Sequence, residues 1–230
     1  MSRFHPKGGL ALILAVALAP VCMTVAQDDA APDAADNVIQ IDKLEFKFER
    51  PRTVIIYPIG DQQNAKGVDA GRIYWYLRYS LTNTGKDTSE FFVTLLARSD
   101  KDRTYADLAL PVVEKKIERI EGRELHSKGD VQKEGKLIST YEEYASGQSR
   151  NCVAIFNPID PEADFITVDV HGLVNDIETQ KLEGGVVRVQ ERVLRLKFAR
   201  PGDEFYTSLD QFTFKSKEWV KIQHDLKLEE

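Results

Sequence analysis

Residues 73–84, with the sequence IYWYLRYSLTNT, constrain the fold more than any other part of the chain. Large apolar side chains, including Trp75 and Leu77, recur there at every second position. Successive side chains of a β-strand point to opposite faces, so this alternation predicts a strand with one face in a core. Turn residues follow at 83–87, and a second strand-like pattern covers residues 90–98. Together they predict an antiparallel β-hairpin with a longer loop.

The N-terminus has the three parts of a secretory signal. Arg3 and Lys7 supply positive charge, residues 9–19 are apolar, and small residues at 24–26 precede a polar stretch. This pattern is typical of a cleaved signal peptide. We therefore expect residues 1–26 to be removed and the mature protein to be exported, to the periplasm or the extracellular space.

Two other interpretations of this N-terminus stay open. The apolar stretch 10–26 has 17 residues and contains Pro20, which is at the lower limit for a retained membrane anchor. Cys22 could carry a lipid, but Val21 stands where a lipoprotein signal has a small residue.

Charge argues against two classes of partner. Without Arg3 and Lys7, the 31 basic residues fall to 29 against 37 acidic ones, a formal charge of −8. Such a surface repels phosphate backbones and anionic lipids, so we expect neither binding of nucleic acid nor adhesion to an anionic membrane surface. No other apolar run is long enough to span a membrane, so we expect no span after signal cleavage.

The rest of the chain divides into a linker and one domain. Residues 27–37 (QDDAAPDAADN) lack apolar periodicity and are expected to be a disordered linker. Residues 38–230 contain many short alternating runs separated by turn residues, which predict an antiparallel β-sandwich. One short helical insert is expected between Pro111 and Gly122, where apolar residues recur at helical spacing.

Residues 186–198 show a change of phase. Apolar side chains fall on odd numbers at Val187 and Val189 and on even numbers from Leu194 onward. Since one core covers one face of a strand, this flip predicts a β-bulge near Glu191.

Several segments carry a resemblance that covers most of residues 38–220. They are residues 74–87 (YWYLRYSLTNTGKD), 146–156 (SGQSRNCVAIF), 164–175 (DFITVDVHGLVN), 200–205 (RPGDEF) and 218–220 (EWV). Together they resemble uncharacterised secreted proteins of planctomycete-type bacteria, and the turns look like those of small extracytoplasmic immunoglobulin-like modules. The resemblance implies an immunoglobulin-like sandwich and an exported location, and it implies no activity and no functional residue.

Metal and cofactor sites are not expected. The mature chain keeps His126, His171, His224 and Cys152, and none of them is paired at a zinc-binding spacing. His171 lies on the polar side of an alternating run and is expected to be a solvated surface residue. Cys152 lies in an apolar run and is expected to be a small buried side chain.

Two acidic segments and one serine segment contain residue types that are used in calcium binding or catalysis. Asp100, Asp102 and Asp107 resemble the start of a calcium loop, but they lack its glycine and its final glutamate, so a charged hairpin tip is favoured. Residues 160–164 (DPEAD) fit an ordinary acidic loop, with a different type of calcium site left open. Residues 146–150 (SGQSR) do not match a nucleophile elbow, and we expect no catalytic residues.

One surface feature is a candidate contact site. Tyr74, Tyr76 and Arg78 share the strand face opposite Trp75 and Leu77. Tyrosine and arginine are enriched at recognition surfaces, so these three are a possible partner surface. The alternative is that another element of the chain covers this face.

Three classes of function remain. The first is an exported, non-catalytic module with a binding or structural role in the cell envelope, whose partner would be an envelope protein or a glycan. The second is a secreted hydrolase or carbohydrate-active enzyme, which needs two carboxylates or a serine–histidine pair in a cleft. The third is an extracytoplasmic metal-handling protein. The absence of motifs favours the first.

Overall fold

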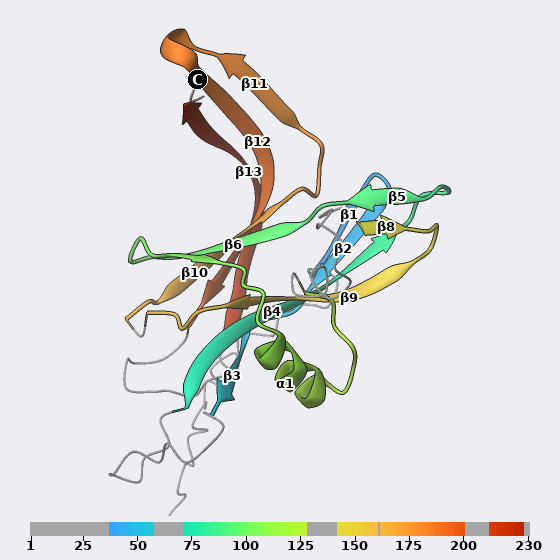
Figure 1. Ribbon diagram of the computed structural model, residues 1–230, viewed down its shortest axis with the longest axis vertical. Helices are drawn as coiled ribbons and strands as arrows, with labels where there is room; N and C mark the ends of the chain where they lie inside the picture. Colours follow the sequence, from blue (N-terminus) through green and yellow to red (C-terminus); the bar gives the residue numbers. More distant parts are fainter. Residues whose placement is uncertain (1–36, 58–70, 128–141, 161, 201–211, 228–230) are drawn as a thin grey trace, which may run out of the picture. The chain divides into compact units, whose positions relative to one another are not determined.

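The computed structural model describes residues 37–57, 71–127, 142–160, 162–200 and 212–227. These residues form thirteen β-strands, all of which pair antiparallel, and one α-helix, which confirms the all-β class with a helical insert (Figure 1). The predicted signal peptide and, except for Asn37, the predicted linker lie outside the described residues. Within the described ranges, no helix has the length and apolarity needed to cross a membrane.

Two large sheets contain most of the strands. The first sheet has the order β1 (Val38–Ile41), β2 (Leu44–Phe48), β4 (Arg72–Asn83) and β3 (Arg52–Ile56), with β9 (Ser149–Phe156) also paired to β4. The second sheet has the order β11 (Ile177–Lys181), β12 (Val186–Ala199), β10 (Phe165–His171), β6 (Thr94–Ser99) and β7 (Thr104–Ala106), with β13 (Thr213–Lys227) also paired to β12. A separate pair is formed by β5 (Ser89–Phe91) and β8 (Glu142–Tyr144).

Strand β4 is the centre of the first sheet. It pairs with β9 along one edge, and with β2 and then β3 along the other. The register shifts by one residue between β2 and β3, because Phe48 lies opposite Tyr79 and Arg52 opposite Tyr76. A shift of one residue moves side chains to the opposite face, so Arg52 and Phe48 point to different sides of the sheet.

The main core lies between the two large sheets. Trp75 and Leu77 are 1% and 0% exposed within it, which confirms their predicted place in the core. Trp75 stacks on Phe156 of β9 with 4.2 Å between ring centroids. Phe48 of the first sheet meets Phe198 of the second edge to face at 6.2 Å. The first contact joins neighbouring strands of one sheet and the second joins the two sheets, and the large apolar areas they bury are the main source of stability in such a core.

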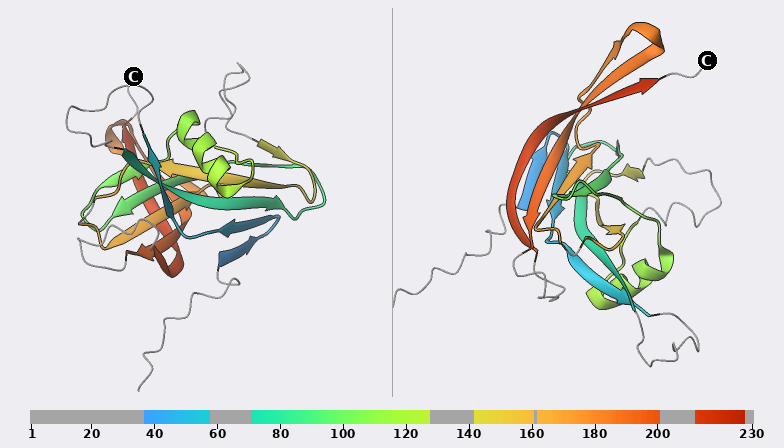
Figure 2. Two further views of the ribbon diagram at one scale, coloured as in Figure 1. Left: turned by 90° about the horizontal axis from the view of Figure 1, so that it is seen from below. Right: turned by 90° about the vertical axis from the view of Figure 1, so that its left-hand side faces the viewer.

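Helix α1 (Pro111–Glu121) covers the other face of the first sheet. Pro111 begins the helix, and Gly122 ends it in the left-handed conformation at φ 65°, as the sequence predicts. Val113 and Ile117 of the helix pack against Ile155 and other residues of that sheet in a second core. The first sheet therefore lies between α1 and the second sheet (Figure 2).

The predicted β-hairpin after β4 is wrong. Strand β4 pairs with neither β5 nor β6, because the chain leaves the first sheet after Asn83 and enters the second at β6. The Asn83 side-chain amide donates to the carbonyls of Asp87 and Tyr144, both at 2.8 Å. It thereby closes the loop that follows β4 and ties it to β8.

The predicted bulge near Glu191 is also wrong. Glu191 pairs regularly with Ile177 of β11 and Ile222 of β13, and the register shift lies between Lys197 and Phe198. Residues 186–192 of β12 extend past the part of the strand that pairs with β10 (Figures 1 and 2). The prediction assumed a single core, whereas this part of β12 does not contribute to either core.

Candidate functional site

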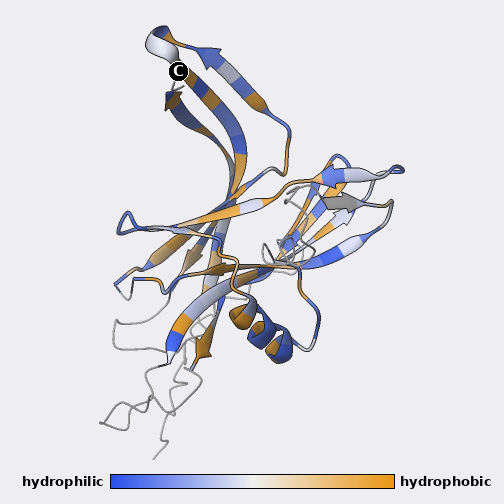
Figure 3. Ribbon diagram, viewed as in Figure 1, coloured by the Kyte–Doolittle hydropathy of each residue, from blue (hydrophilic) through white to orange (hydrophobic). Residues whose placement is uncertain are grey.

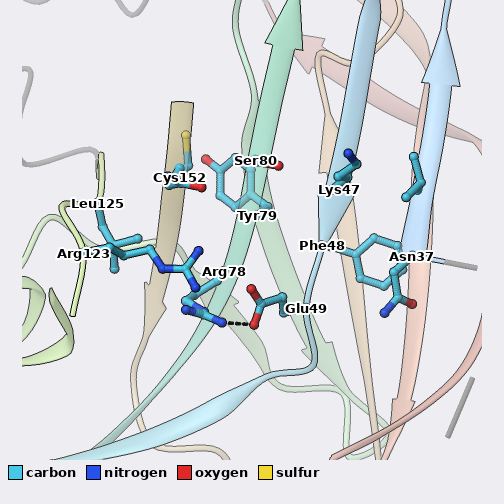
Figure 4. Close-up of a pocket in the computed structure, with 12 residues that line it drawn as sticks. Asn37, Lys47, Phe48, Glu49, Arg78, Tyr79, Ser80, Arg123, Leu125 and Cys152 are labelled. Atoms are coloured by element: carbon cyan, nitrogen blue, oxygen red, sulfur yellow. Dashed lines mark hydrogen bonds and ion pairs between the residues drawn. The ribbon is translucent and has the colours of Figure 1, made fainter. Parts of the chain in front are cut away.

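A pocket of about 280 Å³ opens on the face of the first sheet that α1 partly covers (Figure 4). Strands β1, β2, β4 and β9 and the segment after α1 supply its lining: Asn37, Val38, Lys47, Phe48, Glu49, Arg78, Tyr79, Ser80, Arg123, Leu125, Asn151 and Cys152.

Regular strand pairing positions the polar residues of the pocket. Lys47 lies opposite Ser80, and Ser80 lies opposite Asn151, so these three form a row across β2, β4 and β9. Arg78 lies two residues away on β4 and on the same face. The row and Arg78 together give the pocket a polar floor.

The chain after α1 supplies a further wall. The N–H of His126 donates to the carbonyl of Asn151 at 2.8 Å, and its carbonyl accepts from the N–H of Val153 at 2.9 Å. These bonds attach the segment to β9. Because Gly122 turns the chain sharply at the end of α1, Arg123 and Leu125 reach the pocket.

Arg78 is the buried cation of the site, with 6% of its surface exposed. Its Nη1 donates to Glu121 Oε2 at 2.5 Å, and its Nη2 donates to Glu49 Oε2. Its Nε is buried and has no hydrogen-bond partner among the described residues. A buried donor without an acceptor costs about 1–3 kcal/mol, so Arg78 carries an unused donor, although solvent does not reach the Nε atom in this structure.

Glu121, whose side chain is 5% exposed, binds two more donors. It accepts from the Tyr76 hydroxyl at 2.7 Å and from Arg52 Nη1 at 3.1 Å. Burial and the hydrogen bond to Glu121 raise the pKa of Tyr76 above its ordinary value. Partial burial alone would lower the pKa of Arg52, but its interactions with Glu121, Tyr76 and Glu49 together outweigh burial and the pKa is raised.

The charges around the pocket do not cancel. Arg78 and Arg52 are matched by Glu49 and Glu121, while Lys47 contacts a separate carboxylate, that of Glu45, at 2.8 Å. The guanidinium of Arg123 is exposed and forms no ion pair with any residue that the structure describes. Figure 4 shows it directed toward the side of the pocket where Arg78 lies. One positive charge is therefore left over at the pocket.

The predicted partner surface is covered in part by α1. Tyr76 and Arg78 are buried and Tyr74 is half-buried, so the alternative of a covering element describes this face. Arg78 lines the pocket, whereas Tyr76 holds Glu121. The Tyr74 ring packs in the second core, with the Arg72 guanidinium 5.2 Å from its centroid.

The other sequence candidates lie elsewhere. His171 is not a solvated residue as expected, because its Nδ1 lies 2.7 Å from Glu191 Oε1 and its side chain is mostly buried. Cys152 is buried, as predicted. Asp107 accepts from the N–H of Ile155 at 3.0 Å, which is a structural role. The described residues contain no group of three His, Cys, Asp or Glu side chains placed to hold a metal ion.

Arg78 was the one pocket residue that sequence reasoning singled out as a possible contact. The sequence did not mark Lys47 or Arg123 as candidates. These two residues are 76 positions apart in the sequence, and strand pairing and the docking of α1 bring them together. No local pattern marks either of them.

Comparison with models of known protein families gives no match, and none of the curated proteins or solved structures compared is significantly similar to the chain.

Proposed function

We propose that the protein is an exported, non-catalytic module of immunoglobulin-like β-sandwich type that binds a small organic anion in the Arg78 pocket. The signal-like N-terminus supports export to the periplasm or the extracellular space. Two antiparallel sheets around one main core support the sandwich type. The ligand would be a component of the cell envelope that carries a carboxylate, such as an acidic sugar.

The unsatisfied Nε–H of Arg78 carries the proposal. Rotation of the Arg78 side chain toward the pocket would bring this donor to a ligand oxygen and remove the cost of a buried donor without a partner. Arg123 supplies the charge that an anion needs, since the other pocket cations already contact carboxylates. Guanidinium groups match the geometry of carboxylates, which favours a carboxylate over an uncharged ligand.

The size and polarity of the pocket fit a small ligand. A volume of about 280 Å³ is near the lower end for small-molecule sites. Ser80 and Asn151 offer a hydroxyl and an amide for further hydrogen bonds, while Leu125 and Val38 provide apolar contact. This mixture suits a sugar acid or a small carboxylic acid better than a fully apolar molecule.

Binding is favoured over hydrolysis by the arrangement of the carboxylates. Among the described residues that line the pocket, Glu49 is the one acidic residue, and it already accepts from Arg78. Glu121 directs both carboxylate oxygens to Tyr76, Arg78 and Arg52 instead. Hydrolysis by paired carboxylates needs two such groups beside the same bond.

Nuclear magnetic resonance titration of the purified protein tests the proposal. Galacturonate, citrate and inorganic phosphate are the probes, and the side-chain amide of Asn151 and the backbone amide of Ser80 report binding. We expect galacturonate or citrate to shift both signals. Arg123→Gln should weaken binding about tenfold, the value of one ion pair near the surface of a pocket.

Arg119→Gln is the matched control, because it removes the same charge from an exposed position on α1 outside the pocket. It should leave binding unchanged. Absence of any shift with all three probes, or equal weakening by both variants, would refute the proposed function. Export is tested separately by the intact mass of the protein from its host, which should lack residues 1–26.

A further inference from the structure

The end of the second sheet has two unlike faces. We define the arm as β11, residues 186–192 of β12 and residues 221–227 of β13, which pair with one another in regular register. Side chains on odd positions of β12 share one face with their direct partners on the neighbouring strands. This apolar face of the arm consists of Ile177, Val187, Val189, Ile222 and Leu226, together with Thr179, Lys181, Glu191 and His224.

The opposite face of the arm is polar and internally paired. Arg188 forms two hydrogen bonds with the Asp225 carboxylate, at 2.8 and 2.9 Å. Lys221 Nζ contacts Glu178 Oε1 at 3.0 Å. Figure 3 shows the resulting alternation of hydrophilic and hydrophobic residues along β12. A face whose charged side chains form ion pairs with one another in this way can remain exposed to solvent.

The apolar face has no such cover. Ile177 and Leu226 are 56% and 53% exposed, and none of its five aliphatic residues belongs to either core. Within the described residues, no helix packs on it as α1 packs on the first sheet, and His171 of β10 contacts it at Glu191. Val187, Val189 and Ile222 are half-buried, so the apolar patch is small, but it lies on a strand end that is polar and paired on its other face.

We propose that a second copy of this chain covers the apolar face of the arm, with the two arms stacked face to face and their strands antiparallel. Charge on the face selects this arrangement. Lys181 lies beside Val187 at one end. At the other end lies Glu191, whose carboxylate also contacts His171 at 2.7 Å and His224 at 3.7 Å and keeps part of its surface open to a partner. Antiparallel stacking about Val189 brings Lys181 next to Glu191 of the partner subunit, twice by symmetry.

The parallel arrangement is disfavoured by the same residues. A two-fold axis along the strands would place Glu191 over Glu191 of the partner subunit, and like charges in an interface are repulsive. Antiparallel stacking also places Leu226 over Ile222 of the partner subunit. It therefore covers the exposed Leu226 with an aliphatic side chain of the partner subunit.

The interface is small, which sets its strength. Three strands about 4.8 Å apart and five residues of about 3.4 Å each make a face of roughly 15 by 17 Å. An interface of this size is below the usual range for stable complexes. We therefore expect a weak, reversible dimer that forms at roughly a hundred micromolar or above, and not an obligate one.

Sedimentation velocity of the purified protein between about 1 and 500 µM tests the proposal, with a reversible monomer–dimer equilibrium as the expected result. Val189→Lys, at the centre of the apolar face, should raise the dissociation constant more than tenfold. Gln190→Lys is the matched control, because it adds the same charge at the next residue on the polar face, and it should have little effect. A protein that stays monomeric throughout this range would overturn the proposal, as would equal effects of the two variants.

A mixing experiment shows whether weaker self-association of a variant comes from its charge or from a loss of folding. Lys181→Glu and Glu191→Lys should each weaken self-association, since each places like charges together. An equimolar mixture of the two variants should form a heterodimer, because both cross-contacts are then between opposite charges. Failure of the folded variants to associate on mixing would refute the antiparallel arrangement. The pocket ligand plays no part in this test, so the outcome is separate from that of the proposed function.

Discussion

Replacing Glu121 with glutamine removes one negative charge from the centre of the buried network under α1. The amide has nearly the shape of the carboxylate and still offers one oxygen to the Tyr76 hydroxyl. It cannot balance the charge of Arg78, which is bound to Glu121 at 2.5 Å and is almost wholly buried. The substitution thus isolates the electrostatic part of the interaction.

The contacts of Glu121 give the size of the effect. Removing one partner of a buried ion pair costs about 3–5 kcal/mol. Arg78 keeps its bond to Glu49, and the exposed Arg52 contributes little because solvent screens it. We therefore expect the free energy of unfolding to fall by about 2–3 kcal/mol, somewhat less than for a fully isolated pair.

Urea denaturation followed by tryptophan fluorescence measures this loss, since Trp75 lies in the main core. With a slope of about 2–3 kcal/mol/M, the midpoint should fall by roughly 1 M. Glu124→Gln is the control, because Glu124 is exposed three residues further on and should change stability by less than about 0.5 kcal/mol.

A double-mutant cycle separates the charge from the shape. In an Arg78→Met background, Glu121→Gln should cost about 1–2 kcal/mol less than in the wild type, because the buried cation is gone. Equal costs in both backgrounds would refute the ion pair as the cause. A change below about 0.5 kcal/mol for Glu121→Gln alone would refute the burial of the network.

Three further predictions follow from the described contacts. The pKa of Tyr76 is raised in the folded state, so its contribution to stability is complete below the ordinary tyrosine pKa of about 10 and is lost as the pH rises above that value. Tyr76→Phe should remove one late step from the ultraviolet titration of the tyrosines. It should also reduce the loss of stability at alkaline pH. Gly122→Ala should cost about 1–2 kcal/mol in denaturant unfolding, because its φ of 65° is strained for alanine but no atom lies within 4 Å of the added Cβ. Gly172→Ala should cost far more, because its Cβ would lie 1.6 Å from the Phe92 carbonyl oxygen; equal costs would contradict this geometry. Chelators should leave the melting temperature unchanged within about a degree, and a clear drop would indicate a structural metal.

The elements that the sequence predicted best have local signals. The alternation around Trp75 defines β4, and Pro111 and Gly122 define the ends of α1. Pairing partners have no such local signal. The turn residues after Asn83 show where the chain reverses, but the apolar faces of β6 and β10 decide which sheet it joins. The hairpin prediction was wrong for this reason.

The pocket could not be predicted from the sequence, for a related reason. Its floor depends on the register that sets Lys47 beside Ser80 and Ser80 beside Asn151. Its wall depends on the turn at Gly122, which directs Arg123 toward the sheet. Each residue has an ordinary local environment in the sequence, and the tertiary fold alone gives them a common surface.

The bulge predicted near Glu191 was wrong, but the alternation of apolar residues on which it was based is a real feature of β12. The flip between Val189 and Leu194 required a bulge under the assumption that the strand has one core. The strand instead continues in regular register, so its aliphatic residues lie on opposite faces along its length. A strand end that was exposed to solvent on both faces would be expected to carry polar side chains on both.

A substitution at Val189 can distinguish a role in the stability of the monomer from a role in association between two copies. If Val189 stabilised the folded monomer, Val189→Ser would lower the free energy of unfolding by the cost of a buried aliphatic side chain, more than about 1 kcal/mol. If it serves the contact between two copies, unfolding at low micromolar protein should change by less than about 0.5 kcal/mol, while the dimer dissociation constant rises. We expect the second result, because Val189 lies outside both cores. Denaturation of the variant at two protein concentrations, one below and one above the dissociation constant, separates the two roles, and a loss of equal size at both concentrations would refute the role in association.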